Sequence, residues 1–381
     1  MTPTKGAAMR RIMAMGIASV LSISLIACGQ PTQNQQSTGS AAQSAQKSGE
    51  NQKAETSSTA SKASPVGTVS NAMAEDKDAL VETYPSKFTQ ETYTDADTGL
   101  SVTYNLFLPK DYDASASYPM VVFIADSTCA NGNAEQSLTQ GLGALVWASD
   151  EWQSANPTIV CVPTYPETIL DDRNGYTTTE YVELTKRLID SVSKDYAVDS
   201  SRIYGTGQSM GCMTTLILAS EYPDLYAGCM FVDGQWDTSA LKGLENQRFV
   251  YFAAEDDQSA FAGMSEVKEM FDADSVQYAS AQWQGTWTPD ELSAAAKELF
   301  SQGKDANFVS WASGTIDASS GGNMGGGPGG GTGNGMGGGP GGGAGGSSEG
   351  GPGGGMGGVA YHMASFNYAY RCIAAMEWLF Q

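Results

Sequence analysis

The most constraining feature of this 381-residue chain is a serine between two glycines, placed where a strand-like segment meets a helix-like one. The pentapeptide Gly207–Gly211 follows the run Arg202–Gly205 and precedes the apolar run Cys212–Ala219. A serine at the apex of so sharp a turn needs small neighbours, which gives the Gly-x-Ser-x-Gly pattern its meaning here. The pattern predicts that the Ser209 hydroxyl stands above the carboxyl edge of a sheet, with the N–H of Met210 facing the same place.

The same glycines allow a second interpretation, a turn that receives a dinucleotide pyrophosphate at a helix N-terminus. Gly205, Gly207 and Gly211 would form that turn, and Asp233, after the following strand, would be the ribose-binding carboxylate. Such a turn usually follows the first strand of a domain, whereas this one follows several. The chain also begins like an exported protein, where a nicotinamide cofactor is not expected. The serine turn is therefore favoured, and no cofactor is predicted.

Residues 1–28 have the pattern of a lipoprotein signal peptide. Three cationic side chains precede an apolar stretch at 12–26, which is short for a membrane span. The stretch closes with Leu25-Ile26-Ala27-Cys28, which resembles the bacterial lipobox, in which the cysteine becomes the lipidated first residue. Lipid on Cys28 would hold the protein on the outer surface of a membrane. An ordinary signal peptide or a retained anchor is the alternative.

Two segments of low complexity delimit the predicted domain. Residues 29–74 are rich in Gln, Ser, Ala and Thr with almost no large apolar side chain, which predicts a disordered tether. Residues 321–358 are mostly Gly without a triplet period, which excludes collagen and predicts a disordered insertion. Structured patterns lie on both sides of this insertion, so residues 75–381 are expected to form one domain.

The patterns within residues 75–381 predict an α/β fold. Residues 88–93 and 100–108 alternate in hydropathy on either side of a turn, as in an antiparallel hairpin. Short apolar runs, typical of buried parallel strands, follow at 120–125, 158–162, 202–205, 227–232, 249–254 and 307–311. Helices are expected at 178–196, 213–221, 263–273, 289–302 and 364–380. A mostly parallel central sheet with helices on both faces, an antiparallel edge and a serine turn after the fifth strand is the order of the α/β-hydrolase fold.

Composition limits the kinds of partner and site. The formal net charge of −22 argues against nucleic acid and against adsorption on anionic lipid. Besides Cys28, the remaining cysteines form no Cys-x-x-Cys pair and no Cys/His metal spacing, so no metal site is predicted. Cys161 and Cys229 lie in strand-like apolar runs and are expected to be buried thiols.

A serine nucleophile needs a base, and the chain contains a single histidine. His362 lies after the last strand-like segment and before the C-terminal helix, where the hydrolase order of serine, acid and histidine places the base. The acid is expected after the strand at 249–254, where a buried carboxylate would fix the histidine tautomer. Asp257 is the favoured acid, and Asp256 is held in reserve.

Backbone donors and aromatic side chains complete the predicted site. The N–H of Met210 and one near Ser127, in the loop after the first parallel strand, are expected to hold an oxyanion. Many hydrolases carry His-Gly in that loop, whereas this chain has Ala125-Asp126, an acid that is unfavourable there unless it points away. Trp236 and Tyr165 follow strands and are the candidates for contact with substrate.

Residues 196–211 resemble the Val-Asp-x-x-Arg-Ile-Tyr-x-x-Gly-x-Ser-Met-Gly block of a group of predicted peptidases and esterases. This group belongs to the α/β-hydrolase superfamily and is close to the polyhydroxybutyrate depolymerases and feruloyl esterases. Glu221–Gly228 continues the block, and His362 with Glu377–Phe380 resembles the group's closing His…Trp-Leu-Phe. Ala254–Asp257 is similar to the group's Gly-Glu-x-Asp acid turn, which is why Asp257 leads.

The resemblance spans roughly residues 85–381 apart from the Gly-rich insertion. It implies a serine hydrolase that cleaves a small or polymeric carboxylic ester, in preference to a peptide, outside the cell. Ser209 would attack, His362 would transfer the proton and Asp257 would orient the imidazole. The alternative is a non-catalytic binding lipoprotein with a degenerate hydrolase fold, favoured by the missing His-Gly and by the insertion beside His362. The sequence does not identify the acyl group or the alcohol group of the substrate.

Overall fold

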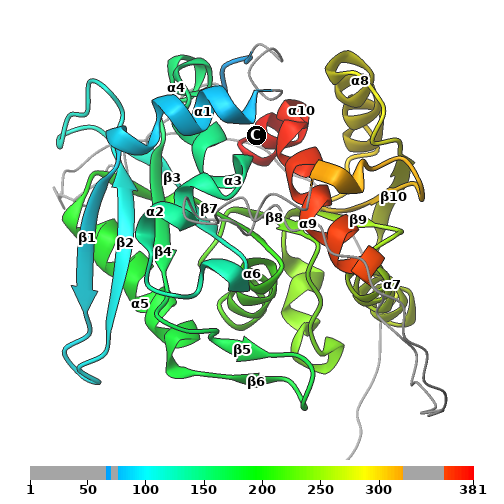
Figure 1. Ribbon diagram of the computed structural model, residues 1–381, viewed down its shortest axis with the longest axis horizontal. Helices are drawn as coiled ribbons and strands as arrows, with labels where there is room; N and C mark the ends of the chain where they lie inside the picture. The colour runs from blue at the N-terminus through cyan, green and yellow to red at the C-terminus, as the bar shows by residue number, and fades with distance from the viewer. Residues whose placement is uncertain (1–65, 70–75, 321–355) are drawn as a thin grey trace, which may run out of the picture. The chain divides into compact units, whose positions relative to one another are not determined.

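The computed structural model describes residues 66–69, 76–320 and 356–381, which all belong to one compact unit that begins at residue 63 (Figure 1). The predicted signal peptide and Cys28 lie outside these ranges, as do nearly all of the predicted tether and insertion. The end of the tether differs from the prediction. Val69 is buried and its N–H donates to Glu377, while Gly67 bonds to Asn156. These residues are therefore packed on the domain.

A nine-stranded sheet forms the centre of the described domain, with β1 at one edge and β10 at the other (Figure 1). Its strands, in spatial order, are β1 (Thr89–Thr94), β2 (Ser101–Phe107), β4 (Ile159–Thr164), β3 (Tyr118–Ile124), β7 (Val198–Gln208), β8 (Gly228–Val232), β9 (Phe249–Ala254), β11 (Ala306–Trp311) and β10 (Tyr278–Trp283). Strand β2 pairs antiparallel with β1 and β4, and the other neighbours are parallel. A separate short hairpin joins β5 (Leu170–Asp171) and β6 (Thr177–Thr178).

Helices cover both faces of this sheet. They are α1 (Lys77–Thr83), α2 (Ala134–Thr139), α3 (Leu142–Leu145), α4 (Asp150–Ala155), α5 (Glu180–Asp195), α6 (Met210–Glu221), α7 (Gln258–Ala273), α8 (Pro289–Phe300), α9 (Met356–Arg371) and α10 (Ile373–Leu379). Side chains from α5, α6 and α7 pack with Met120, Val122 and Ile124 of β3. Side chains from α3, α8, α9 and α10 pack with Val121 and Phe123 on the other face. Because successive residues of a strand point to opposite faces, a continuous apolar run such as β3 serves two cores.

The α/β-hydrolase fold predicted from the sequence is confirmed, with several differences in its elements. The short helices α1 to α4 and the β5–β6 hairpin were not predicted. Strand β10 was not predicted, because this edge strand buries only some of its residues and includes small and polar side chains. The last helix begins earlier than expected, at Met356, and is interrupted at Cys372. Residues 356–358, assigned from sequence to the Gly-rich insertion, are therefore helical.

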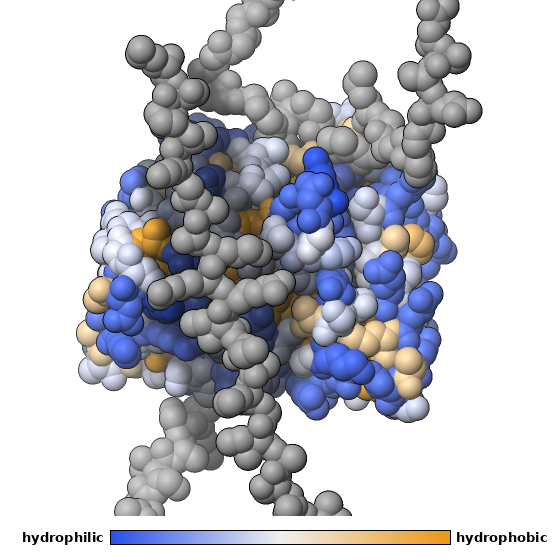
Figure 2. All heavy atoms as spheres, turned by 90° about the horizontal axis from the view of Figure 1, so that it is seen from below, coloured by the Kyte–Doolittle hydropathy of each residue, from blue (hydrophilic) through white to orange (hydrophobic). Residues whose placement is uncertain are grey.

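The surface of the described domain is largely polar. On the face in Figure 2 hydrophilic residues predominate, and apolar residues show as small separate areas. Tyr176 is the large apolar side chain that is exposed among the described residues, at 41%. No helix in these ranges has both the length and the apolar character needed to cross a bilayer. The five cysteines of this part of the chain are free and buried, as predicted for Cys161 and Cys229.

Candidate active site

Ser209 occupies a strained turn between β7 and α6. Its backbone has φ 52°, a conformation that non-glycine residues rarely adopt. The flanking glycines make the turn possible, because a Cβ on Gly211 would lie 1.9 Å from the carbonyl oxygen of Ile124. A Cβ on Gly207 would lie 2.4 Å from the carbonyl carbon of Gly211. The start of α6 therefore approaches the end of β3 closely, with Ser209 at the apex.

His362 connects Ser209 to Asp257. Its Nε2 lies 2.8 Å from Ser209 Oγ, and its Nδ1 forms a hydrogen bond with Asp257 Oδ2. An ionised carboxylate can only accept, so Nδ1 carries the proton and Nε2 is free to accept from the serine hydroxyl. Three elements far apart in sequence thus bring together a hydroxyl, an imidazole and a carboxylate in the order that nucleophilic catalysis requires.

The histidine lies in an unexpected element. The sequence placed His362 before the C-terminal helix, whereas the structure places it within α9. Its ring meets the edge of Phe366, with the ring centroids 5.0 Å apart, and 22% of its side chain is exposed. The helix therefore fixes the backbone of the base, and the neighbouring aromatic ring limits its side-chain rotation.

Opposing influences act on the pKa of His362. Burial is the largest and favours the neutral ring. The hydrogen bond and charge of Asp257, followed by the charges that Asp233 and Asp126 carry when ionised, outweigh it and raise the pKa above its ordinary value. The site consequently favours an imidazolium, the species that forms when a histidine accepts a proton from serine.

The two acids of the turn after β9 have separate partners. Asp257 is buried, bonds to His362 and caps α7 by accepting from the N–H of Ala260 at 3.3 Å. Asp256 instead accepts from the N–H of Gly314 at 2.7 Å and from the Ser313 hydroxyl, in the loop after β11. Asp257, the favoured candidate, is thus the one next to the histidine, and Asp256 holds a loop.

The two predicted backbone donors lie on neighbouring segments. The N–H of Met210 opens α6, and that of Ser127 opens the short helical turn after β3. Neither N–H has a hydrogen-bond partner among the described residues. The close approach of Gly211 to Ile124 brings these segments together. The structure is therefore compatible with an oxyanion site, whose occupation stays a prediction.

Asp126 occupies the position at which many hydrolases have Gly. Its side chain is buried and accepts several hydrogen bonds. Its carboxylate accepts from the backbone N–H and hydroxyl of Thr128, both at 2.7 Å, and from the side-chain amide of Gln140. Gln140 in turn accepts from Gln208, directly before the serine. These bonds satisfy the carboxylate and link the loop after β3 to the serine turn.

The two predicted substrate contacts are both buried. Tyr165 is 2% exposed, and its hydroxyl bonds to Thr185 at 2.7 Å, as expected of a core residue. Trp236 is 4% exposed, and its ring meets the exposed Tyr176 edge-on at 5.2 Å between centroids. Contact of either residue with substrate stays an untested prediction, and Tyr176, which the sequence did not single out, is the accessible member of this aromatic pair.

Asp233 is a residue whose place in the site the sequence did not predict. Its side chain is fully buried at the end of β8 and bonds to Ala254 and Ser365. The dinucleotide interpretation requires a carboxylate that a ribose can reach, and the buried Asp233 does not provide one. Its position directly after a buried strand next to the serine strand was the signal that could have marked it.

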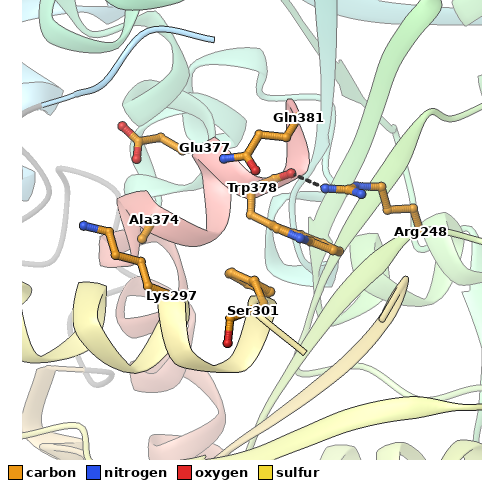
Figure 3. Close-up of a pocket in the computed structure, with 8 residues that line it drawn as sticks. Arg248, Lys297, Ser301, Ala374, Glu377, Trp378 and Gln381 are labelled. Atoms are coloured by element: carbon orange, nitrogen blue, oxygen red, sulfur yellow. Dashed lines mark hydrogen bonds between the residues drawn. The ribbon is translucent and has the colours of Figure 1, made fainter. Parts of the chain in front are cut away.

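A pocket of about 400 Å³ lies at the opposite edge of the sheet, at the amino end of β9 (Figure 3). Arg248 donates to the carbonyl oxygen of Trp378 at 2.6 Å and lies over its ring. The remainder of the pocket is lined by Lys297, Phe300, Ser301, Ala374, Glu377 and Gln381. This pocket contains no serine–histidine pair. No cluster of His, Cys, Asp or Glu that could hold a metal ion occurs in the described part of the chain.

The fold and the serine turn define the class of this protein as an α/β-hydrolase. The family follows from comparison with known families, since residues 96–318 match the Esterase model, whose description reads "Putative esterase". The match covers more than half of the chain, and the protein belongs to this family.

Curated relatives match over short segments. Poly(3-hydroxyalkanoate) depolymerase C of Paucimonas lemoignei is 37% identical over 49 residues, 13% of this chain and 12% of the relative. Acetylxylan esterase A of Emericella nidulans is 33% identical over 70 residues, which are 15% of this chain and 23% of the relative. Feruloyl esterase B of Talaromyces funiculosus is 33% identical over 76 residues, which are 20% of this chain and 20% of the relative. The chain thus aligns with less than a quarter of each relative's length.

Among solved structures, a thermostable esterase shares the fold, with a TM-score of 0.54 and 21% identity over 77% of this chain and 63% of that chain. The predicted resemblance to the esterase group near polyhydroxybutyrate depolymerases and feruloyl esterases is confirmed.

Proposed function

We propose that the protein is a serine hydrolase that cleaves carboxylic esters through Ser209, His362 and Asp257. The observation that carries the proposal is the continuous chain of hydrogen bonds from Ser209 Oγ to His362 Nε2, 2.8 Å, and from His362 Nδ1 to Asp257. Membership of the esterase family supports an ester rather than a peptide as the substrate.

In the proposed reaction Ser209 Oγ attacks the ester carbonyl and its proton passes to His362 Nε2. Asp257 stabilises the imidazolium, and the N–H groups of Met210 and Ser127 stabilise the oxyanion. When the intermediate collapses, the imidazolium gives its proton to the departing alcohol. Water then attacks the acyl-serine by the same route, releases the acid and restores the serine hydroxyl. The chemistry uses no metal and no cofactor.

Activity-based labelling tests the proposal directly. A fluorophosphonate should modify the purified protein at Ser209, and the same sample should hydrolyse p-nitrophenyl acetate. Ser209→Ala should lose both signals, whereas Ser200→Ala, which changes an exposed serine of β7, should keep both. A folded wild-type protein that neither labels nor hydrolyses aryl, feruloyl or acetyl esters would instead favour a binding protein with a degenerate site.

We further propose that the protein acts outside the cell, anchored by lipid on Cys28. The segment Leu25–Cys28, with its lipobox pattern after an apolar stretch, supports this location. Metabolic labelling with a fatty acid in a bacterial host should mark the wild-type chain and not Cys28→Ala. Detergent-free release of the wild-type protein from membranes would contradict the anchor.

A further inference from the structure

A second carboxylic acid lies directly behind the triad. Asp233 is completely buried, and its backbone has φ 44°, a positive value like that of Ser209, which follows the neighbouring strand β7. Its Oδ1 accepts from the N–H of Ala254 at 2.8 Å. Its Oδ2 lies 2.6 Å from Ser365 Oγ, which also lies 2.8 Å from the carbonyl oxygen of His362. Asp233 thus contacts the same turn of α9 that carries the base.

Two hydrogen-bond donors face the carboxyl group of Asp233. Ser365 Oγ donates to its Oδ2 and the N–H of Ala254 donates to its Oδ1, and both bonds favour the ionised form. Complete burial acts in the opposite direction and is the larger influence. Burial without a cation, and not the hydrogen bonds, therefore favours the protonated acid.

The electrostatic surroundings point the same way. The titratable groups that face Asp233 come from the loop after β9, from β9, from α6 and from α9, namely Asp257, Tyr251, Cys212, His362 and Tyr370. Burial keeps the thiol and the two phenols neutral by raising their pKa values. No lysine or arginine within the described ranges forms an ion pair with Asp233. Burial, and secondly the charge of Asp257, raise the pKa of Asp233 to about 7.

We propose that Asp233 is a positioning residue that works in its protonated form. Through Ser365 it fixes the turn of α9 that carries His362, and by staying neutral it leaves the imidazole free to act as a base. A second negative charge beside His362 would stabilise the imidazolium in the resting enzyme, and an imidazolium cannot accept the proton of Ser209. This role rests on the proposed hydrolysis, but the protonation itself can be measured without any turnover.

The first test compares two matched substitutions. Asp233→Asn keeps an acceptor for Ala254 and supplies an N–H donor for Ser365, so it imitates the protonated acid. We expect Asp233→Asn to keep kcat within about tenfold of wild type, while Asp257→Asn loses about 10²–10⁴. If Asp233→Asn loses as much as Asp257→Asn in a folded protein, Asp233 works as an anion and the proposal is wrong.

The second test uses the single histidine of the chain as a reporter. In protein purified without a histidine tag, isotope-labelled histidine gives one imidazole signal, that of His362, whose titration NMR can follow. If Asp233 is neutral while His362 titrates, the neutral Asp233→Asn variant should leave the pKa of His362 and the acidic limb of kcat/KM unchanged. A clear fall in the pKa of His362 in the variant would show that Asp233 carries a negative charge beside the imidazolium, and would overturn the proposal.

A third measurement covers the case in which Asp233→Asn does not fold. Wild-type protein should show the infrared carbonyl band of a buried carboxylic acid below neutral pH, and this band should disappear as the pH rises through neutrality. Absence of the band at pH 6 would overturn the proposal. A protein with the band but without esterase activity would keep the protonated Asp233 and refute the proposed function instead.

Discussion

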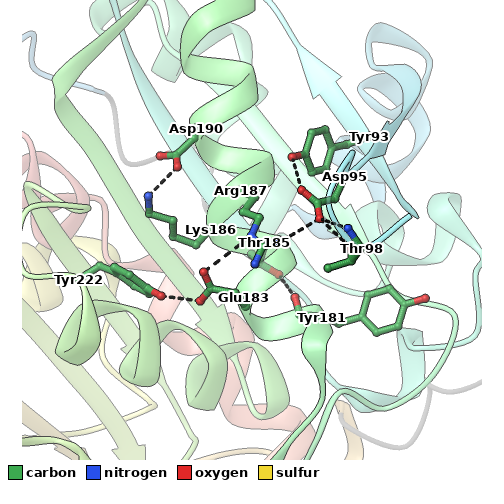
Figure 4. A network of polar contacts seen from close by, with 10 residues as sticks. All are labelled: Tyr93, Asp95, Thr98, Tyr181, Glu183, Thr185, Lys186, Arg187, Asp190 and Tyr222. Atoms are coloured by element: carbon green, nitrogen blue, oxygen red, sulfur yellow. Dashed lines mark hydrogen bonds and ion pairs between the residues drawn. The ribbon is translucent and has the colours of Figure 1, made fainter. Parts of the chain in front are cut away.

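Two groups of charged side chains in this protein are built in opposite ways. Around α5, anions are matched by cations (Figure 4). Arg187 lies 2.7 Å from Asp95 and 3.8 Å from Glu183, and Lys186 lies 2.6 Å from Asp190. At the candidate active site three acids, Asp257, Asp233 and Asp126, surround one histidine, without a lysine or arginine in an ion pair with any of them in the described ranges.

This difference sets where each group titrates. Bonds from the Thr98 hydroxyl and N–H, together with Arg187, lower the pKa of Asp95. Burial without a matching cation raises that of Asp233. The same side chain is therefore shifted in opposite directions by its neighbours. The network of Figure 4 ties the β1–β2 turn to α5 and, through Glu183 and Tyr222, to the end of α6, as a structural network does. In the active site, by contrast, burial places the pKa of Asp233 at about 7.

The largest expected effect is loss of the nucleophile or the base. Ser209→Ala and His362→Ala should each lower kcat by about 10⁴–10⁶, and the double variant should be hardly worse, because the members of a triad act as a unit. Hydrolysis of p-nitrophenyl acetate measures the loss, and thermal unfolding controls for folding. Strictly additive losses would show that the two residues do not share one mechanism.

A smaller effect should separate the two adjacent acids. Asp257→Asn should lower kcat by about 10²–10⁴, since it removes the carboxylate that fixes the histidine tautomer. Asp256→Asn is the matched control, because among the described residues its carboxylate bonds to the loop at 313–314 and not to His362. It should leave the rate nearly unchanged. A damaging Asp256→Asn beside a harmless Asp257→Asn would move the acid by one residue.

The smallest effect is expected in the network of Figure 4. Asp95→Asn should leave turnover unchanged and lower the melting temperature at neutral pH. Since the pKa of Asp95 is lowered on folding, its contribution is present above the unfolded pKa of about 3.9 and is lost as pH falls through the folded value. The difference in melting temperature between wild type and variant should therefore shrink in acid. A difference that grows in acid would refute the ion-pair explanation.

Much of this organisation was readable from the sequence, because it depends on local patterns. The apolar runs predicted the parallel strands, and Gly207 and Gly211 predicted the turn at Ser209, since both are required by close backbone contacts. The placement of Asp257 beside His362 also agrees with the sequence prediction. These features follow from spacing and residue type along the chain.

Other features depend on contacts between distant segments. The sequence did not predict that α9 begins at Met356, because the glycines of its first turn have low helix propensity. His362 was therefore not expected in a helix. The role of Asp233 depends on Ser365, which lies 132 residues further on and meets it only in the folded chain. Tyr165 follows a strand as a substrate contact would, but its bond to Thr185 belongs to the packing of α5.

The burial of the cysteines affects how the protein is inactivated by oxidation. Burial raises the pKa of the Cys129, Cys161 and Cys372 thiols to about 12, so these three side chains present almost no thiolate to an oxidant in the folded domain. Unfolding exposes all five thiols of the described domain at once. In oxidising surroundings, disulfide formation then competes with refolding. Under such conditions the rate of unfolding limits the lifetime of the protein, because a disulfide formed in the unfolded chain can prevent refolding.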